Sequence, residues 1–207
     1  MAKVILINGV KRSGKDYSAQ ILKEELESRV KKVEIFHFAA PLKQIIADTF
    51  ELSLKDLDKM KNNPDDYNLM GRTRLGAKTL DKLFMEFNFR TILQRFGTEA
   101  MRPHFGKDVW AKLLVDKVKR SDADVILVPD FRFLEEYNYC NDSFSGTYGL
   151  SNTKMNDMIT MYIESGKSSK DTHSSEMKPD VEFQFSIDNT KQDESLKTQL
   201  VDFIEKL

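Results

Sequence analysis

A glycine-containing loop near the N-terminus constrains the fold more than any other feature of this chain. The loop reads Gly9-Val-Lys-Arg-Ser-Gly14-Lys15; an apolar run precedes it, and apolar residues at helical spacing follow it (Ala19, Leu22, Leu26). A strand, such a loop and a helix match the first seven positions of the phosphate loop G-x-x-x-x-G-K-[ST]. Backbone N–H groups and the helix N-terminus would hold a β-phosphate, and Lys15 would reach the β- and γ-phosphates. The sequence therefore predicts nucleotide-phosphate binding in an α/β fold.

The eighth position departs from this pattern, because Asp16 stands where Ser or Thr would hold Mg²⁺. One interpretation is that Asp16 holds the metal through water, or serves as a base near an acceptor, with Ser18 as a nearby hydroxyl. The other is that Asp16 is a helix N-terminal carboxylate stabilised by the helix dipole. Both interpretations stay open at this point.

The apolar pattern predicts a parallel sheet of about five strands. Strands are expected at residues 3–8, 33–38, 125–128, 158–163 and 181–187, and helices at 41–50, 80–87, 92–96, 109–120 and 196–207. The polar stretch 52–78 and the turn-rich stretch 140–157 are expected to be irregular. This order predicts a three-layer α/β protein with helices on both faces of the sheet.

Composition excludes several classes of protein. The chain has 207 residues, 40% hydrophobic and 31% charged, with a net charge of −1, which fits one soluble globular domain rather than a disordered or nucleic-acid-binding chain. No apolar run approaches the ~18 residues of a membrane span, and the N-terminus does not resemble a signal peptide. The lone Cys140 excludes an intrachain disulfide. We therefore expect a cytoplasmic protein with no nucleic-acid or membrane partner.

The arginines are distributed unevenly. All nine lie before residue 133, so the last 75 residues contain none. Because arginine suits bidentate recognition of phosphate, the first two-thirds of the chain should supply most rigid anion contacts. The alternative is that lysine simply replaces arginine on the C-terminal surface.

Further motifs follow the loop in chain order: Pro41-Leu42-Lys43, Arg90-x-x-x-Gln94-x-x-Gly97-Thr98-Glu99, Trp110, Val128-Pro129-Asp130-x-Arg132, Asp171-Thr172-His173-x-x-Glu176 and Ile187-Asp188-Asn189. Together with the loop, these motifs resemble the bacteriophage deoxynucleoside monophosphate kinases. The resemblance runs from residue 3 to the closing helix. Phosphomevalonate kinases are more distantly similar, through the loop and the Pro-Leu-Lys tripeptide.

The resemblance implies a P-loop kinase of one domain, residues 1–207, that transfers the γ-phosphoryl group of ATP to a dNMP with Mg²⁺. It implies a helical acceptor-binding insertion at 41–120 and a short lid at 164–177. The expected ATP-binding residues are Gly9, Lys11, Arg12, Ser13, Gly14, Lys15, Asp16, Lys167, Lys170 and Asn189. Asn189 would lie near the adenine, although the same dipeptide Asp188-Asn189 also suits a plain helix-capping turn.

The acceptor phosphate needs a second cationic site, for which Lys43, Arg90, Arg102 and Arg132 are candidates. Arg90 and Gln94 are four residues apart, so they share a helix face that could offer a guanidinium to the phosphate and a carboxamide to the base. Glu99 would orient a substrate-binding arginine. The alternative for both Gln94 and Glu99 is that they are ordinary surface residues. The lid would add His173 and Glu176 to the acceptor site, although a lone histidine such as His173 is commonly a surface residue.

A carboxylate at the end of a predicted strand completes the site. Asp130 follows residues 125–128 at the carboxyl edge of the sheet, where ligands bind in open α/β folds. Asp16 and Asp130 are therefore the expected metal-binding residues, and Lys15, Asp16, Asp130 and Arg132 the expected catalytic set. Asp130 is alternatively a turn former after Pro129.

Two rival functions remain: a kinase of another small phosphorylated acceptor, and a non-catalytic nucleotide-binding regulator. A second anion site disfavours the regulator. The sequence does not distinguish the bases accepted, deoxyribose from ribose, or the oligomeric state, although a homodimer through an exposed helical face is common for such enzymes. A phage origin, and hence the host cytoplasm, follows only from the resemblance.

Overall fold

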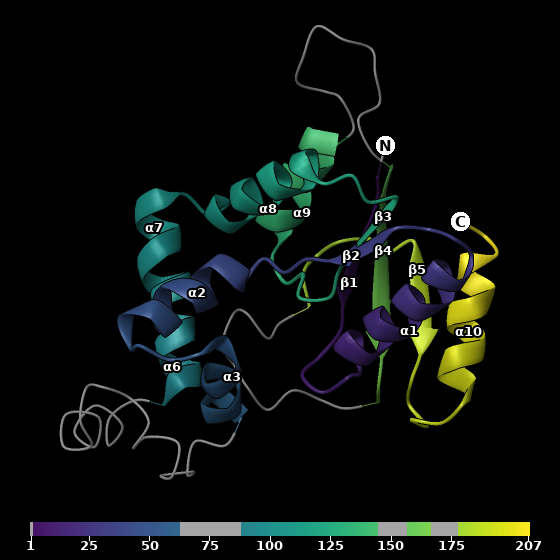
Figure 1. Ribbon diagram of the computed structural model, residues 1–207, viewed down its shortest axis with the longest axis horizontal. Coiled ribbons are helices and arrows are strands. Elements are labelled where there is room, and N and C mark those ends of the chain that lie inside the picture. The colour runs from purple at the N-terminus through teal and green to yellow at the C-terminus, as the bar shows by residue number, and fades with distance from the viewer. Residues whose placement is uncertain (1, 63–87, 145–156, 167–177) are drawn as a thin grey trace, which may run out of the picture. The chain divides into compact units, whose positions relative to one another are not determined.

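The computed structural model of this chain describes residues 2–62, 88–144, 157–166 and 178–207 (Figure 1). The chain divides into two compact units. The first, here called the sheet unit, consists of Met1–Phe38 and Trp110–Leu207. The second, the helical unit, consists of Ala39–Val109.

The sheet unit contains five parallel strands in the order β2-β3-β1-β4-β5. Their bounds are β1 Lys3–Asn8, β2 Val33–Ile35, β3 Val125–Val128, β4 Asp157–Glu164 and β5 Phe185–Asp188. The central strand β1 is buried from Val4 to Asn8, as expected for a strand covered on both faces. The predicted parallel sheet of about five strands is therefore confirmed.

Two strands are shorter than predicted, because side chains replace part of the backbone pairing. The expected strand at 181–187 begins only at Phe185, since Gln184 and Thr160 bond through their side chains. The expected strand at 33–38 ends at Ile35, and the N–H of Phe38 donates to the carboxylate of Asp130 at 2.9 Å. In both places an amide that could have continued the ladder has a side-chain partner instead.

Helices cover both faces of the sheet. Helices α1 (Lys15–Ser28) and α10 (Ser195–Ile204) lie side by side and share one apolar core with the sheet, including Ile5 and Ile7 of β1 (Figure 1). Val4 and Leu6 point to the opposite face and are equally buried. Helices α8 (Val109–Arg120) and α9 (Leu134–Phe144) lie on that side of the sheet in Figure 1.

Helix α9 corrects part of a sequence prediction, because residues 140–144 belong to it and not to an irregular stretch. The carboxylate of Glu136 accepts bonds from the N–H groups of Arg132 and Phe133 at 2.9 and 3.0 Å, which satisfies amides at the start of the helix. Cys140 and Phe144 are buried on its inner face. Residues 145–156 lie outside the described part of the chain.

The helical unit contains α2 (Ala40–Thr49), α3 (Leu54–Asn62) and a run formed by α6 (Phe89–Gln94), the π-helix η1 (Arg95–Met101) and α7 (Arg102–Phe105). Helix α3 was predicted to be irregular, and that prediction is wrong for residues 54–62. The Ser53 hydroxyl accepts a bond from the N–H of Asp56, and Leu57 and Met60 are buried. This hydroxyl satisfies a first-turn amide, so the helix forms despite its polar composition.

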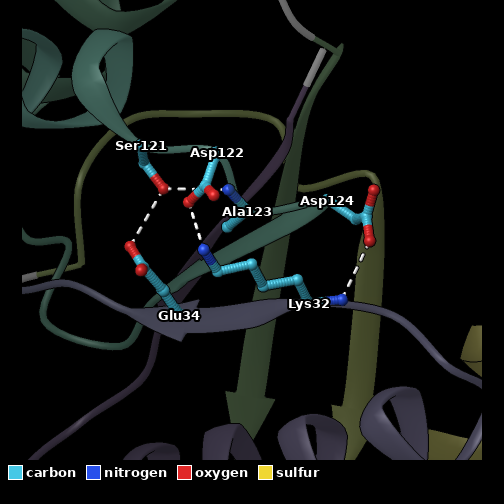
Figure 2. A network of polar contacts seen from close by, with 6 residues as sticks. All are labelled: Lys32, Glu34, Ser121, Asp122, Ala123 and Asp124. Carbon is cyan, nitrogen blue, oxygen red and sulfur yellow. Dashed lines mark hydrogen bonds and ion pairs between the residues drawn. The ribbon is translucent and has the colours of Figure 1, made fainter.

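The amino ends of β2 and β3 are joined by a network of polar contacts (Figure 2). The N–H of Lys32 donates to the Asp124 carboxylate at 2.8 Å, and the N–H of Asp124 donates to the Lys32 carbonyl at 2.8 Å. The Lys32 ammonium pairs with Asp122, and the Ser121 hydroxyl donates to Glu34 at 2.9 Å. These contacts hold the register of β2 against β3 at the edge away from the phosphate loop.

Within the described ranges, no helix is both long and apolar enough to cross a membrane.

Candidate functional site

The sheet topology places a candidate ligand-binding position at the end of β1. The helix after β1 lies on one face of the sheet and the helix after the adjacent β3 on the other, which is the topological switch point where open α/β sheets bind ligands. At this edge the Asn8 amide donates to the Phe131 carbonyl at 2.7 Å. That bond joins the end of β1 to the loop after β3, so the segments carrying Lys15 and Asp130 leave the same edge.

Both glycines of the loop are required by close contacts. A Cβ at Gly9 would lie 2.5 Å from Ser13 Oγ and 2.7 Å from the Ile163 carbonyl oxygen. Gly14 has a φ of 95°, and a Cβ there would lie 2.7 Å from Asn189 Nδ2. Arg12 also has a positive φ, 62°, which is a strained conformation for a residue with a side chain. The loop is therefore bent tightly, as a backbone cradle for phosphate must be.

Lys15 lies in the first turn of α1, and its side chain folds back over the loop. Its Nζ donates to the carbonyls of Gly9 and Val10 at 2.6 and 2.8 Å, and only 8% of the residue is exposed. The ammonium group and the N-terminus of a 14-residue helix thus lie at the same loop. This arrangement can neutralise the charge of a bound phosphate chain.

The other loop residues differ in exposure. Lys11 is half-buried, Arg12 and Asp16 are exposed, and Ser13 is fully buried. Asp16 occupies the first turn of α1, where the helix dipole favours a carboxylate. Both interpretations of Asp16 therefore remain compatible with its position.

Asp130 follows β3 at the switch point and has two neighbours that follow β2. Its Oδ1 accepts the Phe38 N–H at 2.9 Å, and its Oδ2 lies 3.8 Å from His37 Nδ1. His37 was not predicted as a site residue. The signal that could have revealed it is its position two residues after β2, since the carboxyl ends of neighbouring parallel strands share one edge.

Arg132 is half-buried in the turn between β3 and α9. Its backbone N–H is held by the buried Glu136 carboxylate, so Glu136 positions the turn that carries the guanidinium. Sequence reasoning missed Glu136 as well. A carboxylate four residues after an expected site arginine was the available signal.

The carboxylates present fit a magnesium ion that is held largely by substrate. Among the described residues, no group of three or more His, Cys, Asp or Glu side chains could hold a metal. Mg²⁺ in phosphoryl-transfer sites commonly uses one or two carboxylates, with substrate phosphates and water completing its octahedron. Asp16 and Asp130, on the two segments that leave the switch point, supply that number of carboxylates.

Asn189, which the resemblance places near the adenine, directs its side chain to the phosphate loop. It follows β5, is 7% exposed, and its Nδ2 donates to the Ser13 carbonyl of the phosphate loop at 2.8 Å. Its own N–H donates to the Glu164 carbonyl at 2.6 Å. The side chain therefore contacts the loop backbone itself.

Five of the expected acceptor-site residues lie in the helical unit. Arg90 and Gln94 are half-buried on α6, Glu99 is exposed on η1, and Arg102 is 7% exposed at the start of α7. The Nε2 of Gln94 is buried and has no hydrogen-bond partner, unlike a solvated surface amide. The fifth residue, Lys43 on α2, forms an ion pair with Asp58 at 2.8 Å.

The expected lid residues Lys167, Lys170, His173 and Glu176 lie outside the described part of the chain.

No protein-family model and no curated protein matches this sequence. Two solved structures are similar over nearly the whole chain. One is a "putative kinase" from Chloroflexus aurantiacus, with a TM-score of 0.52, 11% identity, and coverage of 99% of this chain and 94% of that one. The other is a mutant APS kinase from Mycobacterium tuberculosis, with a TM-score of 0.45, 11% identity, and coverage of 99% and 97%. The predicted three-layer α/β fold, a parallel sheet with helices on both faces, is thus confirmed.

Proposed function

We propose that this protein is an ATP-dependent kinase that phosphorylates a deoxynucleoside monophosphate to the diphosphate. The observation that carries the proposal is the buried Lys15 ammonium, held over a tightly bent loop at the N-terminus of α1. The kinase-type fold supports the reaction class. The choice of a dNMP as acceptor rests on the motif resemblance.

The donor half of the reaction belongs to the sheet unit. The loop amides, with Lys11, Arg12 and Lys15, would bind the phosphates of ATP. When bound, Mg²⁺ would neutralise negative charge on those phosphates, with Asp16 and Asp130 as its protein ligands, directly or through water. Arg132, fixed by the turn that Glu136 holds, would bind the transferring or acceptor phosphate.

The acceptor half would use the helical unit. Arg90, Gln94 and Arg102 lie along one helical run, α6 to α7, and a monoester phosphate would supply the negative charge that suits a buried guanidinium such as that of Arg102. The buried Gln94 amide would bond the base, which would satisfy its unpartnered Nε2. Lys43 would join the phosphate only by sharing or leaving Asp58.

In the proposed transfer, an acceptor phosphate oxygen attacks the γ-phosphorus of ATP. A new O–P bond forms, the bond from the γ-phosphorus to the β,γ-bridging oxygen breaks, and ADP leaves. The attacking oxygen of a monoester is mostly ionised at neutral pH, so no strong base is required. Asp16 therefore serves metal binding or positioning better than proton abstraction.

A coupled ADP-release assay with Mg·ATP tests the proposal. The acceptor panel contains dAMP, dCMP, dGMP, dTMP, the matching ribonucleotides and mevalonate phosphate. Stimulation by one or more dNMPs is expected. Stimulation only by the non-nucleotide phosphate would favour a kinase of another small acceptor, and ATP binding without stimulation would favour a regulator.

Arginine variants then locate the acceptor site. Arg90→Ala and Arg132→Ala should each raise the KM for the dNMP about tenfold or lower kcat, because a charge-assisted bond to phosphate is lost. The KM for ATP should change little for Arg90→Ala. Arg120→Ala is the matched control, since Arg120 is exposed on α8 and bonds the Asp116 carbonyl. Wild-type kinetics in both test variants would refute this acceptor site.

A further inference from the structure

We infer that Asn189 is a positioning residue that holds the phosphate loop in its phosphate-binding conformation. Its side-chain amide fixes the direction of the Ser13–Gly14 peptide through one buried hydrogen bond. The inference rests on the proposed function only as far as ATP binding at this loop, whatever the acceptor.

The bond connects residues 176 positions apart and is buried at both ends. Nδ2 of Asn189 donates to the Ser13 carbonyl at 2.8 Å, and Ser13 and Asn189 are 0% and 7% exposed. Only the amide nitrogen can donate to a carbonyl, so the bond sets the orientation of the whole carboxamide. Water does not compete freely at a site this enclosed, and loss of the donor would leave a buried carbonyl unsatisfied.

Because the peptide bond is planar, this hydrogen bond also fixes the direction of the Gly14 N–H. In a trans peptide the C=O and the next N–H point in opposite directions. Because the Ser13 carbonyl points to Asn189 and the buried strand ends, the N–H of Gly14 points to the opposite side of the loop. That is the side on which a phosphate would collect the loop N–H groups.

The absence of a side chain at Gly14 leaves room for the contact between Asn189 and Ser13. A Cβ at Gly14 would lie 2.7 Å from Asn189 Nδ2, so the glycine of the motif allows the amide to approach the loop. Asn189 is itself fixed, because its N–H donates to the Glu164 carbonyl at 2.6 Å at the end of β4. The loop is thus fastened to the ends of β4 and β5, and not only to β1, which precedes it.

Two other side-chain atoms at this contact have no hydrogen-bond partner in the described part of the chain. Asn189 Oδ1 and Ser13 Oγ are both buried without a hydrogen bond. Among the described residues, the bond from Nδ2 to Ser13 is therefore the one hydrogen bond that the Asn189 carboxamide makes. Removing it should release the loop.

The test compares Asn189→Ala and Asn189→Asp with Gln199→Ala. Gln199, on α10, bonds the N–H and C=O of Asp188 at 2.9 and 2.8 Å. Its hydrogen bonds therefore hold the same turn through Asp188 and not through the loop, which makes Gln199 a matched control. Each protein is assayed for the Kd of Mg·ATP, the KM of the acceptor, its Tm, and deuterium exchange of the amides in residues 9–15.

Asn189→Ala should weaken ATP binding about tenfold, the equivalent of one buried hydrogen bond, and speed exchange in the loop. Asn189→Asp should weaken it further, because a carboxylate would repel the Ser13 carbonyl. Gln199→Ala should stay within about twofold of wild type in ATP affinity. The acceptor KM should be unchanged in all three variants.

Unchanged ATP affinity and loop exchange in Asn189→Ala, or equal losses in Asn189→Ala and Gln199→Ala, would overturn the inference. If Asn189→Ala does not fold, Asn189→Ser takes its place, since its hydroxyl is too short to reach Ser13. The wild-type protein separates the two proposals: lack of ATP binding would refute the proposed function. Loop exchange in the variants would still decide the role of Asn189.

Discussion

At the residue scale, the phosphate-loop lysine is pre-organised. Lys15 already donates two hydrogen bonds to its own loop, so its side chain has little rotamer freedom to lose when a phosphate binds. Lys43 contrasts with it, because its ammonium forms an ion pair with the Asp58 carboxylate and must share or leave that partner to bind a phosphate. Of these two lysines, Lys15 is therefore expected to contribute more to phosphate binding.

Lys15→Ala should lower kcat at least about 100-fold, because a preorganised cation at the transferring phosphate is lost. Its Tm should stay close to that of wild type. The control is Lys23→Ala on the same helix, where Lys23 lies 3.8 Å from Glu27 on the surface. Steady-state kinetics of both variants provide the measurement. A wild-type kcat in Lys15→Ala would refute the assignment of Lys15 to the ATP site.

At the element scale, one glycine lets two helices of the helical unit pack closely. A Cβ at Gly97 of η1 would lie 2.6 Å from a Leu42 methyl group on α2. Leu42 and Gly97, which belong to two of the motifs quoted from the sequence, thus share a packing role. The π-helix that carries Gly97 also continues from α6, which holds Arg90 and Gln94.

Gly97→Ala should therefore destabilise the protein by about 1–3 kcal/mol through overpacking. In a Leu42→Ala background the same substitution should cost at least about 0.5 kcal/mol less, since the obstructing methyl groups are gone. Urea denaturation of the four proteins in this cycle measures the coupling. Equal costs in both backgrounds would show that Leu42 does not limit the space at Gly97.

A second element-scale prediction concerns the amino ends of β2 and β3. The hydrogen bond from Lys32 lowers the pKa of the Asp122 carboxyl below its ordinary value of 3.8. A carboxyl group whose pKa is lowered by folding stabilises the folded protein at pH values above its pKa in the unfolded state. That contribution is lost as the pH falls through its pKa in the folded state. The urea midpoints of wild type and Lys32→Ala should therefore converge as pH falls from about 5 to about 3.

The size of this effect is small, because exposed ion pairs contribute little. Lys31→Ala is the control, as a neighbouring exposed lysine, and its difference from wild type should not change over the same range. A Lys32→Ala difference that is constant with pH would argue against the Asp122 contact in solution.

At the scale of the whole molecule, parallel pairing gathers residues from distant parts of the chain. Asn8, Asp130, Glu164 and Asn189 all lie at the carboxyl edge of the sheet, at the ends of β1, β3, β4 and β5 or just beyond them. Both faces of the sheet are buried in the apolar core, and Cys140 of α9 belongs to that core with 0% exposure. Burial, and to a lesser degree the charge of Glu136, raises the pKa of the Cys140 thiol well above its ordinary value.

Cys140 should therefore report global unfolding. Only the thiolate reacts readily with a disulfide reagent, and here the thiol is both buried and kept protonated. We expect almost no reaction with DTNB in the native protein, even near pH 8.5 where a free thiol is half ionised. Stoichiometric reaction should appear in guanidinium chloride. Rapid labelling of the folded protein would show that α9 opens locally.

The sequence by itself determined the elements that depend on local patterns. The phosphate loop, β1, β3 and α8 were predicted with the bounds or positions observed, because turn glycines and apolar periodicity act over a few residues. Polar helices were missed: α3 and α9 depend on caps from Ser53 and Glu136 that periodicity does not reveal.

Only the tertiary structure decided how these pieces are joined. The strand order places β2 beside β3, which sets His37 near Asp130. It also places β4 and β5 on the other side of β1, which sets Asn189 against Ser13. These contacts join residues 93 and 176 positions apart, measured from His37 to Asp130 and from Ser13 to Asn189. No local pattern encodes such pairs, because they form only when long-range strand pairing brings the ends of the strands to one edge.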